Sequence, residues 1–421
     1  MSIQKPKGTQ DFLPGIVEQW QRFEQKAREI CARFHYKEIR TPVFESTELF
    51  LRGVGETTDV VSKEMYTFED KGKRSMTLRP EGTAGVVRAY VENKLYGEPD
   101  ISKLFYIGPM FRYEQPQAGR YRQFHQFGIE AFGSDDPALD AEVIAMGYEI
   151  YRELGLSNVR VEINSVGNPE SRAVYRDKLL GFLEPLKDQL CKDCLARMDK
   201  NPMRVLDCKV DQHLFEDAPS ILDSLDEECT NHFEAVQDHL TRLDIPFILN
   251  PKLVRGLDYY THTAFEFKSE GIGSIDTIGG GGRYNGLVSQ LGGPEQPGIG
   301  FGIGIERVLL VMQNQGIVLD PPNPLDVYLI SMGEQAEKEA VKLLYQLRAA
   351  GIRADKDYTS RKMKAQLKSA DRFGARFAAI LGEDELAKGE IVLKDLGTGD
   401  QQSVSLNDWI NQLKEKCERG V

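Results

Sequence analysis

The amino-acid sequence predicts a chain of mixed helix and strand, with antiparallel strands in its first part and a small α/β domain at its end. Residues 105–133 alternate polar and apolar side chains in two runs that a charged loop separates, which is typical of a β-hairpin. Residues 327–416 alternate buried-strand and amphipathic-helix patterns, which is typical of βα units. Between these regions, about residues 171–243 have the charged, helical composition of an insertion.

Composition limits what this chain can be. A length of 421 residues suffices for two or three domains, and the formal net charge of -12 means that any nucleic-acid binding must come from local basic patches. No apolar run approaches the roughly 18 residues of a membrane span. The N-terminus has no apolar signal-peptide core, and six cysteines do not indicate a disulfide framework. We therefore expect a cytoplasmic protein with no membrane partner.

The N-terminal region begins with loop chemistry and then predicts a helix over 18–34, where apolar residues recur at helical spacing. Residues 36–44 are predicted to form a strand that Pro42 interrupts. Proline cannot donate to a strand ladder, so this strand lies at a sheet edge or ends there.

Residues 76–83 are predicted to form a strand that runs into a turn and then a helix. Thr83 is a plausible N-cap of that helix. Glu81 has two interpretations at this stage: a carboxylate that binds an ammonium group, or a solvated residue of an ordinary helix cap.

The hairpin has two chemically distinct faces. Alternation places Met110, Arg112 and Glu114 on one face of its first strand. On its second strand Gln126, Gly128 and Glu130 share one face, and the apolar side chains of residues 127, 129 and 131 share the other. The polar face suits a zwitterion and a phosphate together, although a merely solvated polar face has the same pattern.

The middle of the chain predicts a helix over 140–154 and a strand over 159–164, followed by the insertion. Four cysteines lie in the insertion: Cys191, Cys194, Cys208 and Cys229. One Cys-x2-Cys pair with two widely spaced partners is a weak zinc signal, so we expect free thiols and no metal site.

Residues 255–260 read RGLDYY, which places a guanidinium group and two phenols near a bend ahead of a strand at 264–267. Phenols can hydrogen-bond a polar heterocycle and pack against its ring, although buried core aromatics would give the same pattern.

Glycines fill positions 279–282 and alternate along 298–304, after which helical spacing begins and places Arg307 in the first helical turn. Bare backbone on one strand face indicates close approach of a ligand or another chain. Neither stretch is a complete dinucleotide or P-loop fingerprint, so any ATP binds without a P-loop.

Residues 319–325 have the composition of a linker. The domain beyond it contains a basic window of six residues: Arg361, Lys362, Lys364, Lys368, Arg372 and Arg376. A solvated helix face and an RNA contact are both compatible with this window.

Taken together, these motifs resemble the histidyl-tRNA synthetase family, one of the class II aminoacyl-tRNA synthetases. KGTQDFLP at the N-terminus resembles the family signature, and the strand with Pro42 resembles motif 1, which forms the dimer interface in the family. FRYE and GRYRQFHQ resemble motif 2, and GIGFGIGIERV resembles motif 3. RGLDYY is the most specific segment, because it resembles the histidine-specific signature.

The resemblance implies an α+β catalytic domain over 1–323, an antiparallel sheet flanked by helices, with a helical insertion at about 171–248. It implies an α/β anticodon-binding domain over 324–421. The implied activity is histidine–tRNA ligation: ATP activates L-histidine to histidyl-adenylate, which is then transferred to the 3′ end of tRNA(His). ATP with Mg²⁺ is expected as substrate, with no permanently bound cofactor, no DNA partner and a homodimeric assembly.

The resemblance also implies roles for individual residues. Arg112 and Arg255 are the expected catalytic residues on either side of the α-phosphate, and Arg112 also reaches the substrate carboxylate. The expected histidine-binding residues, besides these two arginines, are Glu81 and Thr83 at the amino group, Gln126 nearby, Glu130 and Tyr260 at the imidazole, and Tyr259 in the pocket wall. The expected ATP-binding residues are Arg112, Glu114, Arg120 and Arg307, and the candidate tRNA contacts are Gln117, Arg122, Arg361 and Lys364.

One residue departs from the pattern of some family members. Gln115 stands where they have arginine, in the loop that meets the tRNA acceptor end. An alternative function is a non-catalytic, histidine-binding regulatory relative of a biosynthetic enzyme. Such relatives lose motif arginines and usually the C-terminal domain, whereas this chain has both.

Overall fold

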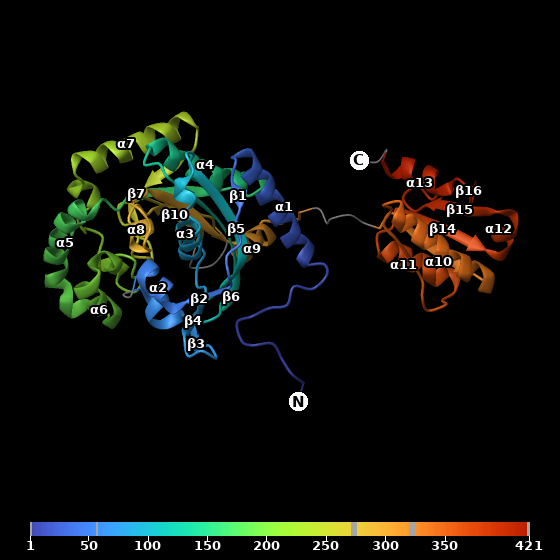
Figure 1. The fold of residues 1–421 in the computed structure, drawn as a ribbon, viewed down its shortest axis with the longest axis horizontal. Coiled ribbons are helices and arrows are strands. Elements are labelled where there is room, and N and C mark those ends of the chain that lie inside the picture. Colours follow the sequence, from blue (N-terminus) through green and yellow to red (C-terminus); the bar gives the residue numbers. More distant parts are fainter. Residues whose placement is uncertain (1, 56–57, 271–275, 320–324, 419–421) are drawn as a thin grey trace. The chain divides into compact units, whose positions relative to one another are not determined.

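The structure is a computed structural model that describes residues 2–55, 58–270, 276–319 and 325–418. The chain divides into two compact units, Met1–Asp320 and Pro321–Val421 (Figure 1). Most of the predicted linker, residues 320–324, lies outside the described residues, and so does its expected domain boundary.

An eight-stranded sheet organises the first unit. In spatial order its strands are β1 (Lys37–Glu38), β5 (Ser102–Phe111), β6 (Gln123–Phe132), β11 (Gly298–Gly304), β10 (Thr277–Arg283), β9 (Thr261–Lys268), β7 (Arg160–Ser165) and β8 (Phe247–Leu249). The predicted antiparallel arrangement is confirmed for the central strands, while the outermost pairs, β1–β5 and β7–β8, are parallel. The predicted strand over 36–44 is split, because β1 ends before Pro42 and β2 (Phe44–Ser46) joins another sheet.

One face of the large sheet is apolar and is covered by helices. α1 (Val17–Arg33), α4 (Pro137–Glu153), α7 (Glu227–Arg242) and α9 (Ile305–Asn314) contribute side chains to the main core. Phe127 and Ile129 of β6 are fully buried there, as alternation along that strand predicts.

The opposite face of the sheet carries the polar side chains of the hairpin. α3 (Thr83–Glu92) packs there in a second apolar cluster that includes Met110 and Tyr106 of β5. A small sheet of β2, β4 (Ser75–Leu78) and β3 (Tyr66–Glu69) lies beside α2 (Thr47–Val54), as Figure 1 shows. A short π-helix, η1 (Val60–Glu64), follows α2 in the chain.

Two local predictions were wrong. Alternation placed Arg112 and Glu114 on the first strand of the hairpin, but β5 ends at Phe111 and both residues follow it. Beyond the strand end, the N–H of Tyr113 donates to the Glu64 carbonyl and not to a residue of β6. Thr83 is not the N-cap of α3, which is Gly82. The carboxylate of Glu81 caps the helix, since it accepts hydrogen bonds from the N–H groups of Thr83 (2.7 Å) and Ala84 (2.8 Å).

The predicted helical insertion is confirmed. It consists of α5 (Pro169–Leu183), α6 (Lys192–Lys200), α7 and several 3-10 turns around its own apolar core, and its helices gather at one end of the unit in Figure 1. Asn168 and Asp226 start α5 and α7 by accepting hydrogen bonds from backbone N–H groups of Ser171 and Cys229. Cys229 packs beside His262, so it does not join the other three cysteines of the insertion.

The second unit is an α/β domain, as predicted. Its sheet has the order β13 (Ala354–Lys356), β12 (Val327–Met332), β14 (Phe377–Gly382), β15 (Glu390–Asp395) and β16 (Gln401–Ser405). Four helices accompany these strands: α10 (Glu334–Ala349), α11 (Met363–Arg372), α12 (Glu383–Lys388) and α13 (Trp409–Glu418). Trp409 is fully buried in the core, which fixes α13 on the domain.

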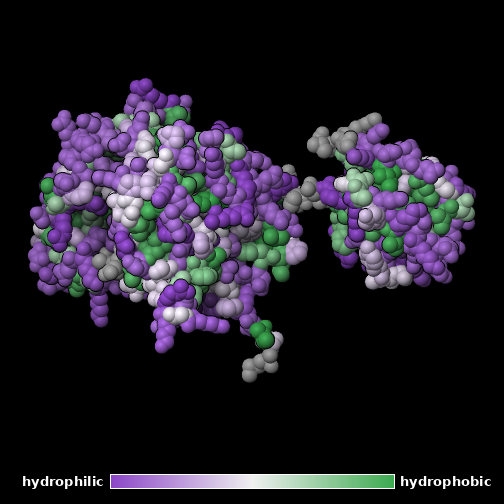
Figure 2. Space-filling model, in the orientation of Figure 1, coloured by the Kyte–Doolittle hydropathy of each residue, from purple (hydrophilic) through white to green (hydrophobic). Residues whose placement is uncertain are grey.

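The visible faces of both units are mostly hydrophilic, with smaller hydrophobic areas between (Figure 2). Within the described part of the chain, no helix has both the length and the apolar character needed to cross a membrane.

Candidate active site

Two adjoining cavities lie on the polar face of the large sheet. The first, which we term the arginine cavity, has a volume of about 220 Å³ and is lined by Arg112, Arg120, Arg255 and Arg307. The second, the tyrosine cavity, has a volume of about 200 Å³ and is lined by Glu81, Thr83, Tyr106, Tyr259, Tyr260 and Tyr284. Both cavities share five lining residues: Arg112, Gln126, Arg255, Gly280 and Gly302.

The arginine cavity concentrates positive charge. Arg120 pairs with Glu114 (3.2 Å), and the Nη1 atom of Arg112 lies 3.9 Å from the same carboxylate. Arg307, in the first turn of α9, donates to the Thr277 carbonyl (2.6 Å). Burial first, and then the positive charge of Arg120, lower the pKa of Arg307 to about 10. Guanidinium groups brought this close together repel one another and favour an anionic ligand between them.

Arg255 is held between the two cavities by its neighbours. Its guanidinium group forms an ion pair with Glu266 and lies 5.6 Å from the Tyr260 ring. Burial lowers the pKa of Arg255, but Glu266 and Tyr260 outweigh that effect and the net shift is upward. Gly280 provides the necessary space, because a Cβ atom there would lie 2.8 Å from Nη1 of Arg255.

Arg112 approaches the same space from the end of β5. Its Nε donates to the Pro80 carbonyl (2.8 Å), and its guanidinium group lies 5.4 Å from the Phe124 ring. These contacts fix the side chain along the wall that both cavities share. Residues 112 and 255, which are far apart in sequence, therefore open onto one space.

The tyrosine cavity carries a buried carboxylate. Glu81 is 3% exposed, and burial raises its pKa although the N–H groups of Ala84 and Thr83 act in the opposite direction. The rings of Tyr259 and Tyr260 are 4.6 Å apart, and that of Tyr284 lies 5.6 Å from Tyr259. The result is a small pocket with polar aromatic walls.

Glu130 lies directly behind the wall of the tyrosine cavity. It accepts hydrogen bonds from the hydroxyl groups of Thr83 (2.7 Å) and Tyr284. The carboxyl group is 1% exposed, and burial is the main reason that its pKa rises to about 8. Gly300 lines the tyrosine cavity next to Glu130. A Cβ atom at Gly300 would lie 2.1 Å from the Glu130 Oε2 atom, so only glycine fits there.

Two buried polar atoms at the shared wall have no hydrogen-bond partner within the described structure. They are Oε1 of Gln126, an acceptor, and Nε of Arg255, a donor. Buried polar groups are normally paired, so this wall is suited to a ligand that carries both donors and acceptors.

Sequence reasoning missed three residues of the site: Tyr106, Tyr284 and Glu266. Tyr106 has the same strand parity as Met110, and that parity could have revealed it. Its ring occupies space that side chains at Gly82 and Gly128 would fill, because a Cβ atom at either position would come within 2.3 Å of it.

The glycines of β10 and β11 serve two different purposes. The bare backbone of these strands predicted close approach of a ligand or another chain, and Gly279, Gly280, Gly302 and Gly304 do line the arginine cavity. Gly281 is different, since a Cβ atom there would lie 1.9 Å from the Gly300 carbonyl oxygen of the neighbouring strand. That glycine permits close packing of the two strands.

The candidate tRNA contacts lie away from the residues that line both cavities. Arg122 stacks on Tyr113, with its guanidinium carbon 3.8 Å from the ring centroid, and Gln117 is exposed in the same loop. In the second unit Arg361 pairs with Asp357, and Lys364 is exposed on α11.

A larger cavity of about 520 Å³ lies beside the arginine cavity. Its wall is mainly apolar and includes Phe12, Trp20 and Leu309, and no arginine or lysine contributes to that wall within the described residues. It therefore suits an anion less well than the arginine cavity does.

Comparison with protein families gives two matches that together span most of the chain. The family described as histidyl-tRNA synthetase matches residues 8–308. The family described as anticodon binding domain matches residues 326–416. The division between them agrees with the two compact units of the structure.

Individual relatives match along the full length. A histidine–tRNA ligase of Bacillus cytotoxicus is 57% identical over 421 residues, covering 99% of this chain and 100% of the relative. A histidine–tRNA ligase of Geobacillus sp. (strain WCH70) is 58% identical with the same coverage.

Solved structures show the same relationship. Apo histidyl-tRNA synthetase of S. aureus superposes with a TM-score of 0.85 at 46% identity, covering 98% of this chain and 100% of that one. A Bacillus halodurans protein, described as an ATP phosphoribosyltransferase regulatory subunit/histidyl-tRNA synthetase, shares the fold at 20% identity, with a TM-score of 0.64 and coverage of 91% and 100%.

Proposed function

The chain belongs to the histidyl-tRNA synthetase family and has its activity, the ATP-dependent ligation of histidine to tRNA, and we propose that the two cavities bind ATP and L-histidine side by side. The full-length relatives at 57–58% identity are ligases, so they favour this function over that of a non-catalytic regulator. The observation that carries the proposal is the shared wall, where Arg112 and Arg255 line both cavities.

The first chemical step joins two anions and therefore needs positive charge. A carboxylate oxygen of histidine attacks the α-phosphorus of ATP, and the bond from that phosphorus to the bridging oxygen breaks as pyrophosphate leaves. We assign Arg112 to both the substrate carboxylate and the α-phosphate, and Arg255 to the same phosphate from the other side. Their positions are fixed before the substrates arrive, by Pro80 and Glu266 respectively, which favours stabilisation of the transition state.

The remaining residues of the arginine cavity suit the rest of ATP. Arg120 and Arg307 are assigned to the β- and γ-phosphates, which the leaving pyrophosphate comprises. The Mg²⁺ that accompanies ATP would find a carboxylate in Glu114, which fits the one or two protein carboxylates that such ions usually use, and it would supply further neutralisation of phosphate charge.

The tyrosine cavity suits a histidine substrate. Glu81, Thr83 and the unpartnered Oε1 of Gln126 provide acceptors for the ammonium group. Tyr260 and Glu130 are assigned to the imidazole nitrogens, with Tyr259 in the wall. Glu130 reaches the imidazole beside Gly300, where a side chain would block its Oε2 atom.

In the second step a hydroxyl of the terminal ribose of tRNA attacks the carbonyl carbon of the adenylate, and AMP leaves. Gln117 and Arg122 are proposed to contact the acceptor end, and Arg361 and Lys364 to contact tRNA from the second unit. The exposed positions of Gln117 and Lys364 support these assignments. A cytoplasmic location follows from the need for tRNA.

A homodimer is proposed from the resemblance to motif 1. It is supported by exposed apolar side chains on and beside the small sheet, namely Val43 (38% exposed), Phe44 (52%) and Phe68 (43%). Large apolar side chains grouped on a surface favour contact with a partner.

The test of the two-cavity site is histidine-dependent exchange between ATP and pyrophosphate. We expect Arg112→Ala and Arg255→Ala each to slow exchange by about 100-fold or more, while circular dichroism shows a retained fold. Arg242→Ala is the matched control, because this arginine is exposed at the end of α7 and pairs with Asp238. Exchange at the wild-type rate in either cavity variant would refute the proposed site.

A further inference from the structure

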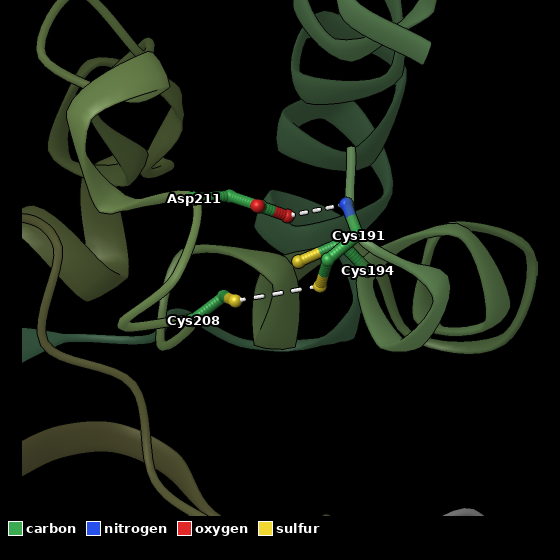
Figure 3. Close-up of side chains that lie close together, drawn as sticks. All are labelled: Cys191, Cys194, Cys208 and Asp211. Atoms are coloured by element: carbon green, nitrogen blue, oxygen red, sulfur yellow. Dashed lines mark hydrogen bonds between the residues drawn. The ribbon is translucent and has the colours of Figure 1, made fainter. Parts of the chain in front are cut away.

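A second cluster of chemically reactive side chains lies in the insertion, apart from the two cavities. Cys191, Cys194, Cys208 and Asp211 form this Cys3Asp cluster, and their ligand atoms all lie within 4.8 Å of one another. Figure 3 shows the three cysteine side chains turned toward one another, with the carboxylate of Asp211 beside them.

The spacing of the sulfur atoms matches a tetrahedral metal site. The Sγ atoms of Cys191 and Cys208 are 3.8 Å apart. A tetrahedron with Zn–S bonds of about 2.3 Å has S···S edges of about 3.8 Å. The cluster is therefore already close to the dimensions of a zinc site.

The four residues also form a recognisable sequence pattern. Cys191 and Cys194 form a Cys-x2-Cys pair, and Cys208 and Asp211 form a Cys-x2-Asp pair. Two such pairs, separated by a short connecting segment, are typical of zinc sites in which each pair supplies two ligands. Sequence reasoning considered Cys229 as the fourth member, but the structure places Asp211 there instead.

The surroundings hold the cluster in place. Cys194 and Cys208 are buried at the edge of the insertion's apolar core, and Asp211 is 3% exposed. The Oδ2 atom of Asp211 accepts a hydrogen bond from the backbone N–H of Cys191 (2.9 Å). Such a bond orients a ligating carboxylate in the way that outer contacts do at metal sites.

We propose that Cys191, Cys194, Cys208 and Asp211 bind one zinc ion. Thiolate sulfur favours zinc over the hard cations magnesium and calcium, and four protein ligands close the coordination sphere, which is typical of a structural rather than a catalytic site. A zinc ion would also give the buried carboxylate of Asp211 a cationic partner, which it otherwise lacks among the sulfur atoms of the cluster.

A zinc ion here would stabilise a part of the chain with little regular structure. Between α6 and α7 the chain forms only 3-10 turns, at Pro202–Val205, Gln212–Leu214 and Ile221–Ser224. Such turns are weak by themselves, and the metal would join two of them to the start of α6.

α6 and the segment that follows it contact the rest of the first unit beside the tyrosine cavity. Arg197 and Arg204 pair with Asp59 (2.8 and 3.2 Å), and Asn201 donates to Asp258 (3.0 Å). Val60 and Leu257, the direct neighbours of these two aspartates, line the tyrosine cavity. Loss of zinc is therefore expected to raise the KM for histidine as well as to lower the melting temperature.

The experiment begins with metal analysis of the full-length chain, purified without a histidine tag from cells grown with added zinc. Inductively coupled plasma mass spectrometry should find about one zinc per chain. The double variant Cys194→Ser/Cys208→Ser should retain less than about a tenth of that amount. Cys31→Ala, which alters a buried cysteine outside the cluster, should bind as much zinc as wild type.

A spectroscopic measurement on the wild-type protein makes the test independent of how the variants fold. Cobalt(II) added after zinc removal should give the visible absorption of tetrahedral cobalt–thiolate coordination, and Asp211→Asn should alter that spectrum. Three outcomes would each overturn the proposal: wild type without zinc and without this absorption, zinc that persists in the double variant, or a disulfide between Cys191 and Cys208 in the native protein.

Discussion

At the scale of single residues, Glu130 is a carboxyl group that the fold keeps from water. Its hydrogen bonds come from Thr83 and Tyr284, one from α3 and one from the chain after β10. These bonds favour the ionised form, but burial outweighs them and raises the pKa to about 8. An imidazole N–H would give Glu130 a further hydrogen-bond donor and so favour its ionised form. Histidine binding is therefore linked to the ionisation of Glu130.

We predict that Glu130→Gln weakens histidine binding by about 10-fold or more and leaves ATP binding within about twofold. Bound histidine favours the ionised form of Glu130, and an amide has one acceptor oxygen where that carboxylate has two, so a bond to the imidazole is lost while the arginine cavity is unchanged. Isothermal titration with each substrate measures the two affinities. Equal losses for histidine and ATP would contradict the imidazole assignment.

The raised pKa also predicts how stability depends on pH. The folded state holds the Glu130 proton up to about pH 8, whereas the unfolded chain releases it near pH 4.3. The stabilisation from the bound proton is fully present below the pKa of the unfolded chain and is lost as the pH rises through the pKa of the folded protein. Between the two pKa values the free energy of unfolding falls by up to about 1.4 kcal/mol per pH unit.

Glu130→Gln removes that dependence. The difference in free energy of unfolding, variant minus wild type, should therefore increase between pH 6 and pH 8, roughly the range in which Glu130 is still protonated when folded. Urea denaturation at each pH measures this difference. A difference that stays constant with pH would show that the carboxyl group is already ionised in the folded protein.

At the scale of elements, the glycine-rich strands β10 and β11 set the shape of both cavities. They pair side by side, and β11 also pairs with β6 so that Gly300 lies opposite Glu130. α9 follows β11 directly and places Arg307 in its first turn. Glu306 anchors this junction, because its carboxylate accepts the backbone N–H of His125 on β6 (2.9 Å).

We predict that Gly300→Ala lowers the free energy of unfolding by about 3 kcal/mol, since its methyl group would lie 2.1 Å from the Glu130 carboxylate and 2.2 Å from the Ile129 carbonyl oxygen. Gly304→Ala is the matched control on the same strand, with its nearest atom at 4.0 Å, and should change stability by less than about 1 kcal/mol. Thermal and urea unfolding compare the two. Similar losses in both variants would refute the steric explanation.

At the scale of the whole molecule, the proposed chemistry lies in the first unit, and the second unit carries only proposed tRNA contacts. The arginine and tyrosine cavities lie within Met1–Asp320, and the basic residues of α11 lie within Pro321–Val421. In the proposed two-step reaction the adenylate forms before tRNA reacts, so we expect that mutation can separate the two functions.

Lys364→Glu should raise the KM for tRNA about 5- to 10-fold and leave histidine-dependent pyrophosphate exchange unchanged. A positive charge near phosphates is replaced by a negative one, at a site outside the catalytic unit. Lys338→Glu on α10 is the control, an exposed lysine of the same domain. If exchange falls together with aminoacylation, the basic window acts on the fold and not on tRNA.

The proposed dimer is testable through the apolar surface of the small sheet. Phe44→Asp should shift the protein from the mass of two chains to that of one in sedimentation velocity, because it places a charge in a desolvated contact. Val174→Asp, at an equally exposed apolar residue of α5, should leave the mass unchanged. A wild type that sediments as a single chain would exclude the dimer.

The sequence by itself determined the chemistry of the two faces of β6, the order of the longer elements and the family. Alternation along β6 separated Gln126 and Glu130 from Phe127 and Ile129, because strand parity is a local property of the backbone. It did not predict short elements such as α2 and β3, which are too brief to show a period.

Only the tertiary structure decided which distant residues meet. It brought Tyr106 and Tyr284 into the wall of the tyrosine cavity, and it placed Asp211 with three cysteines while Cys229 packs beside His262. The physical reason is that such contacts depend on how separate elements pack, and spacing along the chain does not by itself show which of several candidate residues will meet.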